Sequence, residues 1–203
     1  MRKIKRIVIA TQNDGKVNEI KQIFQGVKGV TVVSAKEAGV IEDVIEDGKT
    51  FAANALKKAV FVAKRTGQWA MADDSGICVD ALGGEPGVSS ARWAGENAPG
   101  NRWVELLLSK LQGVPEEKRT AHFETMAVLI NPQNEAFFFR GIVRGRILVE
   151  PRGQAHPRLP YDIVFVPDGE TRTFSEMSDD EKNAISHRGR AFAQLKEFIQ
   201  RMS

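Results

Sequence analysis

The chain has 203 residues, and 29 Lys and Arg against 26 Asp and Glu give a formal net charge of +3. A hydrophobic fraction of 42% and a charged fraction of 27% are ordinary for a globular protein and exclude a disordered, collagen-like or coiled-coil chain. The small charge excess does not indicate nucleic-acid binding, and the length favours one domain over residues 1–203.

Cysteine content and hydropathy indicate a cytoplasmic protein with no membrane partner. Cys78 is the only cysteine, so the chain can form neither an intrachain disulfide nor a cysteine zinc cluster. The apolar stretch behind the basic start, Ile7 to Ala10, is shorter than the roughly 7–15 residues of a signal-peptide core. No apolar run approaches the roughly 18 residues of a membrane span.

The first half of the chain alternates short apolar runs with helical patterns. Polar turn residues separate the first run from the helix that begins near Val17, and an acidic segment precedes the second helix. The last apolar run is expected to end at Asp73, before a glycine-rich loop. The predicted elements are a strand at 7–10, a helix at 17–24, a strand at 30–33, a helix at 50–66 and a strand at 69–72.

The second half predicts a helix after Asn101, a β-hairpin and two closing helices. Ser178 followed by Glu181 has the spacing of a capping box, which places a helix start at Ser178. His187-Arg188-Gly189 is expected to interrupt this helix before a final one. The other predicted elements are hairpin strands at 122–130 and 135–149, a strand at 163–166 and a helix at 190–201. The mixed order predicts an α/β class with an antiparallel part.

The polar loop after the first strand is a candidate phosphate site. A helix N-terminus offers free backbone N–H groups to an anion, and Lys16 would add a point charge. The loop lacks the spacing of a P-loop, so the alternative is a capped turn with a surface lysine.

Asp73 and Asp74 are candidate metal or catalytic residues. Two adjacent carboxylates next to a buried strand lose hydration and repel one another unless positive charge lies nearby. A Mg²⁺ ion would supply that charge, with Glu46 or Asp47 as a second carboxylate. The alternative is that Asp73 caps a turn and Asp74 is solvated.

Lys182, His187 and Arg188 form a third candidate cluster, expected to share one neighbourhood. Arg and Lys can hold phosphate, and His can bond a base or a phosphate. The alternative is that they serve the helix dipole. His122 and His156 lack metal-ligand spacing with His187, so a histidine zinc site is not expected.

Together these motifs resemble the inosine/xanthosine triphosphate pyrophosphatase family, the non-canonical purine nucleoside triphosphate pyrophosphatases. The resemblance runs nearly end to end. It rests on four separated motifs in the family's order: Ile9–Lys16, Thr50–Ala55, Ala72–Gly76 continuing through Gly83–Arg92, and Glu181–Gly189.

The resemblance implies a two-lobed single α/β domain, with a long mixed central sheet flanked by helices, a nucleotide cleft between the lobes and assembly as a homodimer. It implies Mg²⁺-dependent hydrolysis of ITP, dITP and XTP to the monophosphate and pyrophosphate, which cleanses the nucleotide pool. Asp74 looks like the general base and a metal ligand, and Glu46 like the second metal ligand. Substrate-binding residues carried over from the family are Thr11, Gln12, Asn13, Asp14, Gly15 and Lys16 for the triphosphate, Ser75 for the phosphate or sugar, and Leu159, Pro160, Tyr161, Asp162, Lys182, His187 and Arg188 for the base region.

One departure from the family concerns base binding. Where the family carries Gly-Phe-Gly-Tyr-Asp-Pro, this chain reads Arg158-Leu159-Pro160-Tyr161-Asp162-Ile163. Stacking on an aromatic side chain is worth ~1–3 kcal/mol per base, so Leu159 is expected to weaken base binding. Two alternatives therefore stay open: a nucleotide pyrophosphatase of relaxed specificity, and a nucleotide-binding module without turnover.

Overall fold

The computed structural model describes residues 4–95, 98–156 and 159–202; Arg158 of the altered base motif lies outside them. The strands are β1 (Arg6–Ile9), β2 (Thr31–Ser34), β3 (Trp69–Val79), β4 (Thr120–Ile130), β5 (Ala136–Ile147) and β6 (Phe165–Pro167). The helices are α1 (Asp14–Ile23), α2 (Phe51–Thr66), α3 (Gly100–Lys110), α4 (Asp179–Ile185) and α5 (His187–Met202).

The strands form one mixed sheet in the order β2-β1-β3-β4-β5-β6. β1 pairs in parallel with β2 and with β3, whereas β5 and β6 are antiparallel. The expected α/β class with an antiparallel part is therefore confirmed. None of the helices in the described ranges is long and apolar enough to cross a membrane.

Within their described parts, the residues group into two compact units. The first unit comprises residues 4–74, 125–141 and 188–202, and the second comprises 75–124 and 142–187. Each unit has its own hydrophobic core.

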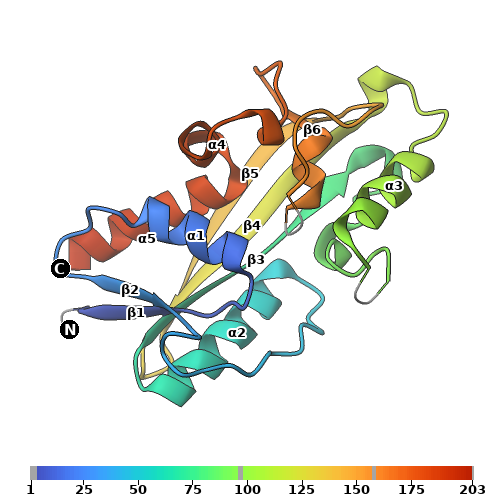
Figure 1. The fold of residues 1–203 in the computed structure, drawn as a ribbon. Coiled ribbons are helices and arrows are strands. Elements are labelled where there is room, and N and C mark those ends of the chain that lie inside the picture. Colours follow the sequence, from blue (N-terminus) through green and yellow to red (C-terminus); the bar gives the residue numbers. More distant parts are fainter. Residues whose placement is uncertain (1–3, 96–97, 157–158, 203) are drawn as a thin grey trace. The chain divides into compact units, whose positions relative to one another are not determined.

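The first unit is layered, with helices on both faces of its strands (Figure 1). Because successive side chains of a strand point to opposite faces, Ile7 and Ile9 of β1 pack with α1 and α5, whereas Val8 packs with α2. In β3, Met71 packs on the side of α1 and α5, whereas Ala70 and Ala72 pack on the side of α2. This alternation continues into the residues that follow Ala72.

In the second unit, α3 packs its apolar face on the sheet. Val104, Leu107 and Leu111 are buried with residues of β3, β4, β5 and β6. Phe123, Phe165 and Phe174 form an aromatic group in this core, with ring centroids 4.8–6.1 Å apart.

Three predicted boundaries were wrong. β3 does not end at Ala72 but runs on to Val79 through Asp73-Asp74-Ser75-Gly76. It lies between β1 and β4 in the sheet, and it continues beyond the end of β1. The strand expected at 163–166 is a 3₁₀ turn at Pro160–Ile163 followed by β6. The break before the last helix falls at Ser186, whose backbone is extended, so His187-Arg188-Gly189 begins α5.

Candidate functional site

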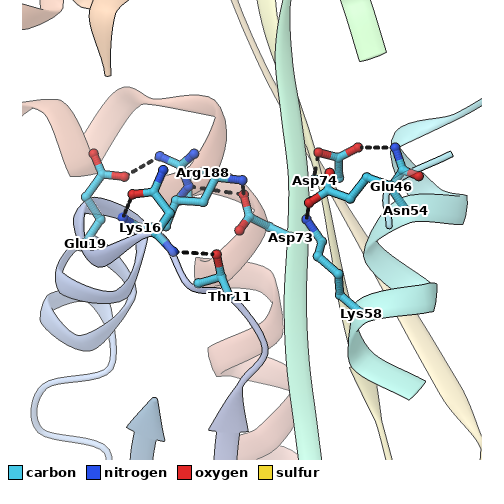
Figure 2. Close-up of polar contacts among 10 residues, drawn as sticks. Thr11, Lys16, Glu19, Glu46, Asn54, Lys58, Asp73, Asp74 and Arg188 are labelled. Atoms are coloured by element: carbon cyan, nitrogen blue, oxygen red, sulfur yellow. Dashed lines mark hydrogen bonds and ion pairs between the residues drawn. The ribbon is translucent and has the colours of Figure 1, made fainter. Parts of the chain in front are cut away.

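Asp73 and Asp74 lie in the middle of β3, just beyond its pairing with β1. The last register pair joins Ile9 and Met71, and Ala10 N–H donates to the carbonyl of Met71 over 2.7 Å. The strand alternation turns Asp73 toward α1 and α5, and Asp74 toward α2. Figure 2 shows their partners on opposite sides of β3. The two carboxylates therefore need no shared counter-ion.

Asp73 is fully buried between two cations. Its Oδ2 lies 3.0 Å from Lys16 Nζ and accepts a hydrogen bond of 3.3 Å from Arg188 Nε. Arg188 also donates to Glu19 of α1. Burial alone would raise the pKa of Asp73, but the charges of Lys16 and Arg188 outweigh it and hold that pKa below its ordinary value. Asp73 is thus an ionised anchor for both cations.

Asp74, on the opposite face, has one amide hydrogen-bond donor and a more distant cation as partners. Asn54 Nδ2 of α2 donates to its Oδ2 over 2.9 Å, and Lys58 Nζ lies 3.9 Å from its Oδ1. The same ammonium lies 2.9 Å from Glu46 Oε1. Burial raises the pKa of Asp74 and Glu46 adds to that, although Lys58 and Lys16 oppose it. A carboxylate with a raised pKa is suited to accepting a proton.

The polar loop before α1 is the capped turn that its sequence offered as one alternative. Asn13 caps the helix, because its side chain accepts from Lys16 N–H over 3.2 Å, and Thr11 Oγ1 accepts from Asn13 N–H. Lys16 is nevertheless no surface lysine. Its side chain is 14% exposed, and burial lowers its pKa while Asp73 opposes that. Gln12 Nε2 donates to the carbonyl of Val40, which ties the loop to the segment before α2.

The remaining predicted residues lie in the second unit. Lys182 and Asp162 form a buried ion pair of 2.7 Å, and Lys182 Nζ lies 5.8 Å from the ring centre of Phe174. His187 stacks on Phe123, with ring centroids 4.7 Å apart. Tyr161 donates its hydroxyl to the carbonyl of Ser90 over 3.1 Å, and burial raises its pKa. Lys182 and His187 therefore contact the same aromatic group, although the helix that was expected to align them ends at Ile185.

Leu159, Pro160 and Ser75 complete the predicted second-unit residues. Leu159 precedes the 3₁₀ turn that begins at Pro160, and Pro160 is buried. Ser75 follows Asp74 in β3. Arg188, grouped with Lys182 and His187 by sequence, belongs to the first unit through its bonds to Glu19 and Asp73.

Sequence reasoning missed Asn54, Lys58 and Glu19. A signal for the first two was present: Asn54 and Lys58 are four residues apart on the apolar face of α2, between Phe51 and Ala59, where a solvated side chain is not expected. Buried polar residues on such a face indicate buried partners. Glu19 likewise follows Val17 on the inner side of α1.

Glu46 and Asp74 fit the requirements of a magnesium ion. Both point an oxygen at Lys58 Nζ, so their carboxylates already converge on one positive charge. A small cavity of about 30 Å³ adjoins Glu46 and Lys58, and Thr11 and Gln12 are among its other lining residues. No group of three metal-ligating side chains occurs in the described ranges, but Mg²⁺ is typically held by one or two carboxylates together with phosphates and water.

Comparison with known proteins identifies relatives along almost the whole chain. Residues 7–198 match the model of the Ham1 family. A dITP/XTP pyrophosphatase from Streptomyces avermitilis is 45% identical over 94% of this chain and 94% of its own length, and one from Leifsonia xyli is 43% identical over 98% and 97%. The solved structure of a HAM1 protein from Coxiella burnetii superposes with a TM-score of 0.87 at 35% identity, covering 98% of this chain and all of that one.

Proposed function

The chain belongs to the Ham1 family, and on this premise we propose that it hydrolyses dITP, ITP and XTP to the nucleoside monophosphate and pyrophosphate, which removes these non-canonical nucleotides from the pool. The observation that carries the proposal is Asp74: a buried carboxylate with a raised pKa, oriented by Asn54, in a neighbourhood of buried lysines. Such a group can take a proton from water at neutral pH.

In the proposed reaction, Asp74 accepts a proton from a water molecule as the water oxygen attacks the α-phosphorus. The bond between that phosphorus and the oxygen bridging to the β-phosphate breaks, and pyrophosphate leaves with the bonding electrons. Lys16, whose ammonium Asp73 holds at 3.0 Å, would offset the negative charge on the phosphates. Glu46 and Asp74 would hold Mg²⁺, which, when bound, would neutralise phosphate charge.

Base selection is proposed for the second unit. A site whose buried donors bond the 6-oxygen of hypoxanthine or xanthine leaves those donors unpaired against the 6-amino group of adenine. Lys182 is a candidate donor, since Asp162 holds its ammonium in a buried position. Guanine shares the 6-oxygen, so its rejection requires that the pocket disfavour its 2-amino group.

We also propose a cytoplasmic homodimer. The single cysteine leaves the fold independent of an oxidising compartment, and the homodimer follows from the family resemblance. Light scattering of the purified chain tests the dimer, and a mass equal to one chain of 22.4 kDa would contradict it.

The test of the reaction is release of pyrophosphate and phosphate, with Mg²⁺, from ITP, XTP, GTP and ATP. The wild type is expected to release pyrophosphate from the first two, and Asp74→Asn to lose about 10²–10⁴-fold, the usual contribution of a general base. Glu46→Gln is expected to raise the Mg²⁺ requirement, whereas the matched control Asp47→Asn, in an exposed pair with Lys57, is expected to behave as the wild type.

Each other outcome has a distinct meaning. Release of phosphate alone would contradict cleavage between the α- and β-phosphates. Equal release from all four nucleotides would indicate relaxed specificity, which the replacement of the family's aromatic by Leu159 favours. Tight binding without any release would indicate a nucleotide-binding module.

A further inference from the structure

We propose that Lys58 is a built-in counter-cation of Glu46 and Asp74 that competes with the divalent metal for their oxygens, so that the protein alone binds the metal weakly. The inference rests on the proposed function, which makes these two carboxylates the metal ligands, and it concerns what Lys58 does to them.

Lys58 is buried in a place where a lysine is costly. Its side chain is 7% exposed and lies on the apolar face of α2, in the same buried stripe as Ala55, Ala59 and Val62. Removing an ammonium from water is unfavourable unless it is paired. Here the pairing consists of Glu46 Oε1 at 2.9 Å and Asp74 Oδ1 at 3.9 Å. A single positive charge therefore already serves both carboxylates.

A divalent cation would require the same oxygens. Mg²⁺ and Mn²⁺ bind carboxylate oxygen at close range, and an ammonium held on the same two groups repels a cation placed between them. Lys58 must therefore move away from at least one carboxylate when the metal binds. The four-carbon stem of lysine allows this movement without displacing the helix, and the adjoining cavity lined by Thr11 and Gln12 offers room beside it.

The neighbouring residue on α2 provides a matched control. Lys57 forms an ion pair with Asp47 over 2.7 Å, but its side chain is 44% exposed and its partner is Asp47 rather than Glu46 or Asp74. Lys57→Met and Lys58→Met thus remove the same charge from consecutive residues. Only the second removes the cation from the carboxylate pair.

The experiment measures Mn²⁺ binding to the full chain without nucleotide, by electron paramagnetic resonance of free Mn²⁺. Lys58→Met is expected to lower the Mn²⁺ Kd by about tenfold, and Lys57→Met to change it less than about twofold, because exposed pairs are screened by water. The double variant Lys58→Met with Glu46→Gln is expected to lose the increase in Mn²⁺ affinity that Lys58→Met gives. An equal effect of the two methionine variants, or no effect of Lys58→Met, would overturn the proposal.

The wild type offers a second measurement that does not depend on the folding of a variant. Titration with Mg²⁺ is expected to shift the ¹³Cε resonance of Lys58, assigned with Lys58→Arg, while that of Lys57 stays unchanged; an unmoved Lys58 resonance would overturn the proposal. Pyrophosphate release by the wild type is scored separately. If the wild type releases pyrophosphate but Lys58 affects neither the Mn²⁺ Kd nor its own resonance, only the counter-cation role of Lys58 is contradicted. If Lys58 shows these effects but no pyrophosphate is released, only the proposed function is contradicted.

Discussion

Two identical residues in succession acquire opposite properties because of the strand that holds them. Asp73 is enclosed by Lys16 and Arg188, which hold its pKa below the ordinary value, whereas burial raises the pKa of Asp74. Neighbouring carboxylates whose surroundings separate their pKa values are typical of sites that divide structural and proton-transfer roles. The environment, and not the residue type, is therefore what distinguishes Asp74 as the proposed base.

Asp73→Asn is expected to destabilise the protein by about 3 kcal/mol, because it leaves the buried charges of Lys16 and Arg188 without their shared anion. Urea unfolding measures this loss. The exposed control Asp47→Asn is expected to stay within about 0.5 kcal/mol of the wild type. Equal stability of both variants would show that the buried pairs contribute no net stability.

The lowered pKa of Asp73 predicts that the stability difference between the wild type and Asp73→Asn depends on pH. A carboxylate whose pKa is lowered by folding contributes stability that is full above its unfolded pKa, about 3.9, and is lost as pH falls toward the folded value. The stability advantage of the wild type over Asp73→Asn should thus be constant near neutral pH and shrink below about pH 4. Unfolding curves across this range measure it, and an advantage that grows on acidification would contradict the assignment.

At the scale of elements, α2 positions the acidic segment before it. Residues 41–50 form no helix or strand, yet Gly48 N–H donates to Asn54 Oδ1 over 2.8 Å, and Asn54 in turn donates to Asp74. Thr50 caps α2 through Ala53 N–H. One amide side chain therefore connects the segment that carries Glu46 to the proposed base.

Gly48→Ala is expected to disturb this connection. An added Cβ would lie 2.6 Å from Asn54 Oδ1 and 2.9 Å from Ala53 Cβ, closer than such atoms approach, so the segment must shift. We expect a higher Mg²⁺ requirement for pyrophosphate release with little change in unfolding free energy, because most residues of the segment are exposed and none is fully buried. Lys49→Ala, at the exposed neighbouring position, is the control; equal metal requirements in the two variants would contradict the role of Gly48.

Much of this element scale could be predicted from local sequence signals. The apolar face of α2, the capping box at Ser178 and the hairpin around residues 131–135 follow from periodicity and turn chemistry, and the structure confirms them. The extension of β3 through Asp73 and Asp74 could not be predicted, since charged residues in mid-strand depend on partners from α1, α2 and α5. Those partners lie up to 115 residues away along the chain.

At the scale of the molecule, neither compact unit is a continuous piece of chain. The chain passes between them at residues 74–75, 124–125, 141–142 and 187–188. The last passage delivers α5 to the first unit, where Phe192, Leu195 and Ile199 are fully buried against β1 and α1. The first core is thus completed only by the end of the chain.

Deletion of residues 188–203 is expected to prevent folding. Loss of Phe192, Leu195 and Ile199 removes roughly 1.5–3 kcal/mol each, a sum comparable to the roughly 5–15 kcal/mol that stabilises a typical domain. Loss of cooperative thermal unfolding in circular dichroism measures this outcome. The control Arg201→Ala, which alters only an exposed pair with Glu197, should unfold as the wild type does; a cooperative transition in the truncated chain would contradict the prediction.

The alternation of β3 also limits how its gene can change. A single codon gained or lost between those for Met71 and Asp73 would keep the reading frame and both aspartates, yet it would exchange the faces to which they point. After an insertion the first aspartate would face Asn54 and Lys58, but the second would stand two residues beyond the position that Lys16 and Arg188 contact. The number of residues between Met71 and the two aspartates is therefore fixed by the partners on both faces, because any gain or loss there separates at least one aspartate from the side chains that hold it.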